Sequence, residues 1–151
     1  MVGLVDCIGN VVAPMICSSV NNYDSGLLPE SFTVFKQVAH EVGLPIKGKE
    51  LVLDKGFDGK RNRKLIWNAG MVPVIPENVK NRNTSKPKRG RPRHFNLKSY
   101  HERHVIERLN AWHDTYRATV IRYDRKLANF MGHCILAFTL INLRHFCGRS
   151  Q

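Results

Sequence analysis

The chain has 151 residues and a mass of 17.3 kDa, which suits one domain of ordinary size. With 42% hydrophobic and 24% charged residues, it has the composition of a globular protein and not of a disordered tail. The formal net charge of +12 indicates a polyanionic partner, most often nucleic acid. Residues 1–57 hold four basic and six acidic side chains, whereas residues 58–151 hold twenty and six, so we expect the C-terminal two thirds to contact that partner.

Cysteine spacing and hydropathy exclude several further classes. The four cysteines include no Cys-x-x-Cys pair, which argues against a zinc ribbon or a thioredoxin motif and favours reduced thiols. His133, Cys134, His145 and Cys147 could suggest a metal site, but they lie in an apolar helical segment and we favour core packing for them. No signal peptide is visible, and the apolar run 134–143 is about half a membrane span. The sequence predicts a soluble, cytoplasmic protein without a membrane partner.

The first elements in chain order are a β-hairpin and a helix. Residues 2–5 and 11–17 are apolar runs joined by a turn that contains Gly9-Asn10, which predicts antiparallel pairing. Pro29 suits the first turn of a helix, and apolar residues follow at helical spacing as far as Val42. A glycine then ends this helix.

Two short strands enclose a second helix. Residues 50–53 form an apolar strand, and Asp58 can cap a helix that ends at Gly70. Residues 71–75 form the next strand. The alternation of strands and helices predicts an α/β domain with a mixed sheet, and we expect residues 1–151 to form this one domain.

The C-terminal half begins with a basic loop, 77–98, that has no hydrophobic period and is long enough to be functional or disordered. From residue 98 the helical period returns and predicts one helix. Its apolar face comprises Val105, Leu109, Trp112, Tyr116 and Val120. A last helix, 126–146, is apolar on most sides and is predicted to be buried.

Two carboxylates stand out by position. Asp54 directly follows a predicted strand, and ligands bind at the carboxyl ends of strands in open α/β sheets. Tyr100, Arg103 and Glu107 are spaced to share one helical face. A carboxylate from a strand end and one from a facing helix can share Mg²⁺ ions that activate a phosphodiester. Alternatively, the aspartate serves a turn and the glutamate pairs with a nearby arginine or lysine.

These residues carry a resemblance to a known family. The matching segments are Leu51-Val-Leu-Asp54-Lys-Gly-Phe-Asp58, Gly70-Met-Val-Pro-Val-Ile-Pro76, Tyr100-His-Glu-Arg103-His-Val-Ile-Glu107-Arg, Arg122-Tyr-Asp, Lys126-Leu-Ala-Asn-Phe and Leu143-Arg. In this order they resemble the DDE transposases of bacterial insertion sequences, families four and five, over nearly the whole chain. The resemblance implies an RNase H-like mixed sheet flanked by helices. It also implies cleavage and joining of DNA at element ends by three carboxylates with Mg²⁺ or Mn²⁺.

The resemblance assigns roles to individual residues. Asp54 matches the second catalytic Asp and Glu107 the catalytic Glu, and both are implied metal ligands. Tyr100 and Arg103 match the signature Tyr-x2-Arg-x3-Glu-x6-Lys and are implied DNA contacts. The signature's lysine is replaced by Asp114, which removes one expected DNA contact.

The first catalytic Asp of the family has no clear counterpart. It lies on the first, central strand of the fold, whereas the two strands before the first helix here fit the second and third. Asp6 is the sole early candidate, but it adjoins a hairpin turn. We therefore expect an N-terminally truncated transposase that lacks the first strand, binds metal weakly and turns over poorly, because both ions must be held for near-attack geometry. The exposed sheet edge would need a covering chain.

The basic loop offers a DNA contact of its own. Pro87-Lys-Arg-Gly90-Arg-Pro92-Arg is similar to an AT-hook, whose arginines enter the narrow minor groove of A·T-rich DNA. General phosphate contact by the loop is the favoured alternative, and a solvated charge run is the other. The candidate DNA-binding residues of this loop are Lys86, Lys88, Arg89, Arg91 and Arg93.

Two functions remain open. The first is a transposase that cuts and joins DNA in transposition and recombination, impaired by truncation. The second is a DNA-binding remnant or regulator that occupies terminal inverted repeats, as a homo-oligomer or paired with full-length transposase, without cutting. The resemblance favours the first as ancestry, and the missing strand favours the second as present activity. Either would act on double-stranded DNA in the bacterial cytoplasm, at the nucleoid.

Overall fold

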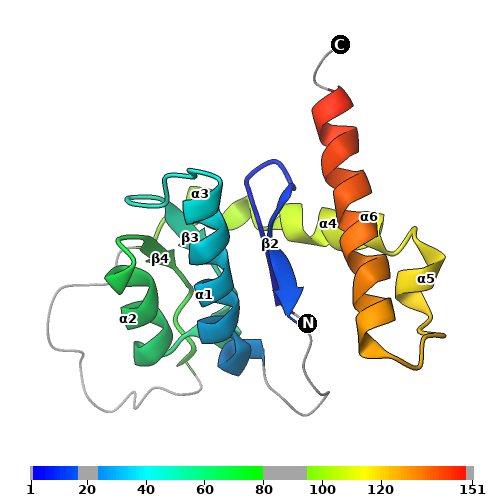
Figure 1. The fold of residues 1–151 in the computed structure, drawn as a ribbon. Helices are drawn as coiled ribbons and strands as arrows, with labels where there is room; N and C mark the ends of the chain where they lie inside the picture. The colour runs from blue at the N-terminus through cyan, green and yellow to red at the C-terminus, as the bar shows by residue number, and fades with distance from the viewer. Residues whose placement is uncertain (1, 17–23, 80–94, 149–151) are drawn as a thin grey trace, which may run out of the picture.

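The computed structural model describes residues 2–16, 24–79 and 95–148 of the chain (Figure 1). The strands are β1 (Val2–Val5), β2 (Val11–Ile16), β3 (Glu50–Val52) and β4 (Val72–Val74). The helices are α1 (Asp24–Glu41), η1 (a 3-10 turn, Lys55–Phe57), α2 (Lys60–Asn68), α3 (Leu97–His101), α4 (His104–His113), α5 (Arg117–Val120) and α6 (Leu127–Gly148). This is a mixed α/β structure, as expected. The described strands form two separate two-stranded sheets and not the single mixed sheet that the sequence predicted.

The N-terminal hairpin is confirmed. β1 pairs antiparallel with β2, with Leu4 opposite Ala13 and Val5 opposite Val11. Gly9 in the connecting turn has φ of 100°, a conformation that glycine adopts without steric cost. Successive strand residues point to opposite faces, so the hairpin presents Leu4 to one side and Val5 to the other.

The second sheet is a strand–helix–strand unit. β3 pairs parallel with β4, with Glu50 opposite Val72, and α2 lies in the connection between the two strands. Gly70, with φ of 75°, follows the end of α2 as predicted. The predicted cap was wrong by one residue, because Gly59 is the N-cap of α2. The Asp58 carboxylate instead accepts hydrogen bonds from the Arg63 side chain and from the backbone N–H of Asn78, each at 2.9 Å.

Helix α1 begins earlier than predicted. It starts at Asp24, so Pro29 lies inside the helix and not in its first turn. A proline there cannot donate the hydrogen bond that continues the helix toward residue 25. Leu27 and Leu28, which precede it, are both buried. Burial of these two leucines offsets the missing hydrogen bond and explains why the helix extends beyond the proline.

The predicted helix after residue 98 is three helices. The helix is interrupted at Glu102-Arg103, between α3 and α4, and again at residues 114–116, between α4 and α5. Val105 and Leu109 are buried as expected, but Val120 at the end of α5 is exposed. The apolar spacing continues through both breaks, so periodicity alone could not locate them.

Two hydrophobic clusters lie on opposite faces of the hairpin. The first joins the hairpin, α1, α2 and the two residues that flank β4, and its buried members are Leu4, Ala13, Phe32, Phe35, Ala39, Ile66, Met71 and Ile75. The second joins α4 and α6, with Leu109, Cys134, Phe138 and Ile141 buried and Val5 and Val11 packed against them. Figure 1 shows α1 beside the hairpin, with α6 on the other side of the hairpin.

Helix α6 has nearly the predicted bounds but not the predicted burial. Its buried side chains are Cys134, Ala137, Phe138 and Ile141, whereas several large apolar side chains of the same helix are exposed. The exposed ones are Leu127, Ile135, Leu136, Leu140, Leu143 and Phe146. Among the described helices, α6 is the one that is long and apolar enough to cross a membrane, and length and composition alone are weak evidence that it does.

Candidate functional site

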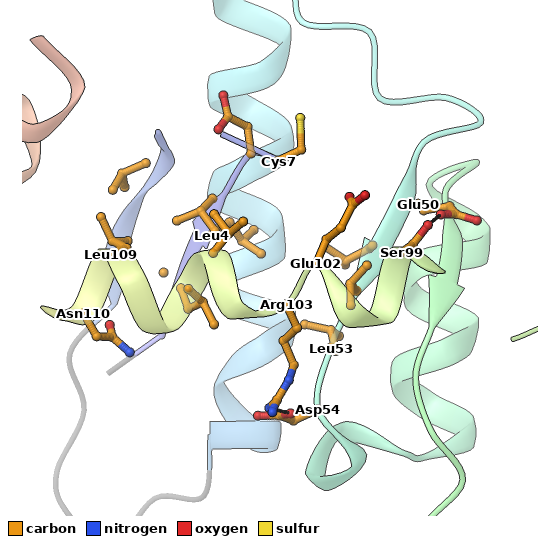
Figure 2. A pocket seen from close by; sticks show the side chains of 18 of the residues that line it. Leu4, Cys7, Glu50, Leu53, Asp54, Ser99, Glu102, Arg103, Leu109 and Asn110 are labelled. Carbon is orange, nitrogen blue, oxygen red and sulfur yellow. Dashed lines mark hydrogen bonds and ion pairs between the residues drawn. The ribbon is translucent and has the colours of Figure 1, made fainter. Parts of the chain in front are cut away.

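A pocket of about 490 Å³ separates the hairpin from β3 (Figure 2). β1 and the turn after it line one side, and residues Glu50–Asp54 line the other. Helices α3 and α4 and the break between them cover it through side chains such as Ser99, Arg103 and Ile106. The pocket is therefore bounded by segments from the beginning, middle and end of the described chain.

Arg103 brings the two predicted catalytic carboxylates together. Its Nη1 forms an ion pair with Oδ1 of Asp54, and its Nη2 lies 3.5 Å from Oε1 of Glu107. Asp54 follows β3, Arg103 lies at the break between α3 and α4, and Glu107 is in the first turn of α4. The exposed fractions of the Asp54, Arg103 and Glu107 side chains are 53%, 36% and 66%, so both carboxylates are open to solvent. One guanidinium thus spans the two acids.

Tyr100, the first residue of the predicted signature, contacts this arginine. The Arg103 guanidinium carbon lies 5.6 Å from the ring centroid of Tyr100, a cation–π distance, and the Tyr100 ring in turn packs against Phe95 at 5.3 Å. Tyr100 is half-buried. The structure therefore gives Arg103 three neighbours inside the chain, two acidic and one aromatic.

The Asp6 carboxylate stabilises the hairpin turn. Its Oδ1 accepts the backbone N–H groups of Ile8, Gly9 and Asn10 at 2.8–2.9 Å, and its Oδ2 accepts the Asn10 side-chain amide at 2.7 Å. Both oxygens are thus committed to the hairpin turn, although Asp6 also lines the pocket. A short carboxylate that accepts nearby backbone donors is typical of turns.

Glu50 is a pocket residue that the sequence reasoning missed. Ser99 donates to its carboxylate at 2.5 Å, and the Asn96 side-chain amide donates to both of its oxygens at 3.1 and 3.2 Å. The partners lie 46 and 49 residues away along the chain. No local pattern could have connected them, because Glu50 reads only as the first residue of a strand.

The residues of the predicted DNA-binding loop lie outside the described residues. These are Lys86, Lys88, Arg89, Arg91 and Arg93. Of the predicted DNA contacts, Tyr100 and Arg103 are described, and both engage partners within the chain.

The donor set does not fit the metal centre that the family resemblance implies. Within residues 2–16, 24–79 and 95–148, no three His, Cys, Asp or Glu side chains converge in a way that could hold an ion. Asp54 and Glu107 supply only two carboxylates, and the single positive charge of Arg103, which pairs with both, offsets half of their negative charge. A fixed two-ion site uses more carboxylates than two, so the described residues do not form one by themselves.

The histidine and cysteine side chains near the C-terminus do not gather either. His133 pairs with Asp124 at 3.0 Å, and His145 contacts the Asn10 side chain at 3.0 Å. Cys134 is a buried thiol, whereas Cys147 and Cys7 are exposed thiols. Cys17 lies outside the described residues.

Comparisons with known proteins give no relative. No protein-family model, curated protein or solved structure matches this chain. The transposase lineage and the RNase H-like fold accordingly rest on the sequence motifs alone.

Proposed function

We propose that this chain is a double-stranded DNA-binding protein of DDE transposase ancestry that does not cut DNA on its own. It would bind the terminal inverted repeats of an insertion sequence in the bacterial cytoplasm, alone, as a homo-oligomer or with full-length transposase. The proposal that the chain does not cut DNA rests on the Arg103 guanidinium, which forms ion pairs with both Asp54 and Glu107.

Charge supports DNA as the partner. Residues 58–151 hold twenty basic and six acidic side chains, and seven of these basic residues fall within 78–96, where no acid occurs. Such a segment releases counterions from the phosphate backbone when it binds, which makes affinity strongly salt-dependent. The order of the signature residues supports the transposase ancestry, and the RNase H-like fold is part of that proposal.

The ion pairs argue against cleavage by the isolated chain. A guanidinium that pairs with two carboxylates offsets half of the negative charge that would attract a divalent cation, and it engages one oxygen of each acid. The transposase activity stays the second candidate, because the same arrangement does bring Asp54 and Glu107 to one place.

A salt titration tests DNA binding. Fluorescence anisotropy with a labelled duplex should give an affinity that falls steeply as salt rises. Replacing Arg89, Arg91 and Arg93 with Gln should reduce the slope of log affinity against log salt by up to about 2.7, or about 0.9 for each lost phosphate contact. The charge-matched control replaces Lys36, Lys47 and Lys49, which lie in the acidic N-terminal part, and should leave the slope nearly unchanged. Equal slopes for the two triple variants would remove the loop from the proposal.

A nicking assay separates the two functions. Supercoiled plasmid that carries the element ends is incubated with the chain and Mg²⁺ or Mn²⁺. The proposal expects binding without nicks. Metal-dependent nicks that disappear in Asp54→Ala and Glu107→Ala would establish the transposase activity instead.

A further inference from the structure

The pocket faces the edges of two strands. It is lined by the consecutive residues Gly3–Cys7 on the β1 side and Glu50–Asp54 on the β3 side. A pocket over the face of a sheet would be lined by alternate residues, because successive side chains point to opposite faces. β2 contributes only Val11 to the lining and β4 contributes no residue. The pocket therefore lies in the plane of the two sheets, between β1 and β3.

The backbone hydrogen bonds of β3 also indicate that one of its edges faces the pocket. The carbonyl of Lys49 and the N–H of Leu53 bond to β4, at 2.9 and 3.1 Å. In a parallel ladder, alternate residues direct their backbone groups to opposite sides, so those of Val52 point away from β4 and toward the pocket. On the other side, β1 pairs only with β2 among the described strands. Each strand thus presents one strand edge to the pocket.

Apolar residues cover the pocket above and below this plane. Leu4, Leu51 and Leu53 belong to the cluster packed under α1. Ile106, Leu109 and Phe138 belong to the cluster under α4 and α6. A strand in this position would be buried on both faces, and strands of that kind are continuously apolar and rich in β-branched residues.

One end of the pocket is acidic, and the other end holds an ion pair. Figure 2 shows Cys7, Glu50 and Glu102 toward one end and Asp54 with Arg103 at the other. β1 runs toward the first end and β3 runs toward the second, so the two strands cross the pocket in opposite directions. Any strand between them is parallel to one and antiparallel to the other.

We propose that this pocket binds an extended apolar segment of another polypeptide, which adds a strand between β1 and β3. The occupant is a polypeptide because strand edges on both sides require backbone donors and acceptors on both sides. Its centre is about four uncharged, β-branched residues, matched to the four residues of β1, and the flank at the end of Glu50 and Glu102 is basic to complement these carboxylates. The result is one five-stranded sheet in the order β2, β1, partner, β3, β4. This inference concerns a protein partner and does not depend on DNA binding.

A pair of peptides tests the proposal. The probe is a fluorescent peptide of alternating Val and Ile residues with two lysines at each end. Its control has the same sequence with alternate apolar residues N-methylated, which removes hydrogen-bond donors on one edge and keeps the hydrophobicity. The full-length chain should bind the probe in an anisotropy titration and bind the control at least about tenfold more weakly. Equal affinities would mean non-specific apolar adsorption and would overturn the proposal.

Matched variants place the binding in the pocket. Ile106→Trp fills the pocket and should abolish binding, whereas Ile135→Trp on the exposed face of α6 should not change it. Hydrogen–deuterium exchange of the unmodified protein gives an independent measurement, because a bound strand should protect residues 3–7 and 50–54. Absence of that protection with bound probe would contradict the proposal. If the chain dimerises and the probe dissociates the dimer, the occupant is a second copy, which would overturn the assignment to another polypeptide.

Discussion

The side-chain amide of Asn142 pairs with both backbone groups of Val11. Its Oδ1 accepts the Val11 N–H at 2.9 Å, and its Nδ2 donates to the Val11 carbonyl at 3.0 Å. The amide thereby takes the place of a neighbouring strand at the start of β2. Since the two residues are 131 positions apart, this pair joins the last helix to the N-terminal hairpin.

Replacing Asn142 with Ala should lower the free energy of unfolding by about 2 kcal/mol, because two partly buried backbone groups lose their partners. Urea denaturation followed by circular dichroism measures this change. Asn129→Ala on the same helix is the control, and because that side chain is exposed its effect should stay within about 0.5 kcal/mol. Equal losses in the two variants would show that the amide pair does not hold α6 to the hairpin.

The hairpin turn should depend on the acceptor at Asp6 more than on its charge. Asp6→Ala removes the oxygen that accepts three backbone N–H groups, and we expect a loss of about 2 kcal/mol. Asp6→Asn keeps an oxygen at that position and should cost less than half as much. Thermal unfolding of the two variants gives the comparison. If Asn were as harmful as Ala, the negative charge and not the turn geometry would be the important property.

Local chemistry explains which parts of the fold could be predicted. The hairpin, β3, β4 and the end of α2 follow from short apolar runs and from glycines that adopt positive φ at Gly9 and Gly70. The predicted start of α1 was wrong because Pro29 favours a helix start, whereas burial of Leu27 and Leu28 extends the helix beyond it. Tertiary packing overrode a correct local preference.

Long-range pairing explains what could not be predicted. The separation into two sheets depends on which strands meet, and the apolar pattern of β1 and β3 does not encode that. The spacing of Arg103 and Glu107 predicted their shared helical face, and the alternative that Glu107 pairs with a nearby arginine agrees with the 3.5 Å contact. The contact of Arg103 with Asp54 crosses 49 residues and requires the break between α3 and α4, which no periodicity reveals.

The Arg63 side chain should be essential for the β3–β4 unit. It is 10% exposed, and it donates to Asp58 at 2.9 Å and to the carbonyl of Ile75 at 2.7 Å. Arg63→Met leaves a largely buried carboxylate and a carbonyl without this partner, so we expect a loss of about 3 kcal/mol in the free energy of unfolding. Denaturant titration provides the measurement.

Two further variants distinguish the loss of the Arg63–Asp58 ion pair from the loss of any arginine on this helix. Arg61→Met on the exposed side of the same helix should change stability by less than about 0.5 kcal/mol. Asp58→Asn combined with Arg63→Met should be less destabilising than the sum of the two single variants, because the second replacement removes the carboxylate left behind. Strict additivity would mean that the two side chains act independently.

Removing the guanidinium that joins Asp54 and Glu107 should raise affinity for divalent cations. Arg103→Met leaves two exposed carboxylates close together without their shared positive charge. Two unit charges about 4 Å apart interact by about 1 kcal/mol in water, and a divalent ion doubles this to about 2 kcal/mol, so Mn²⁺ should bind about thirtyfold more tightly to the variant. Electron paramagnetic resonance of free Mn²⁺ measures the difference. Arg108→Met, which removes an exposed arginine of α4 near Trp112, controls for net charge and should have a smaller effect. Adding Asp54→Asn and Glu107→Gln to Arg103→Met should cancel the gain; if the gain persisted, the ion would bind elsewhere and these two acids would not form a cation site.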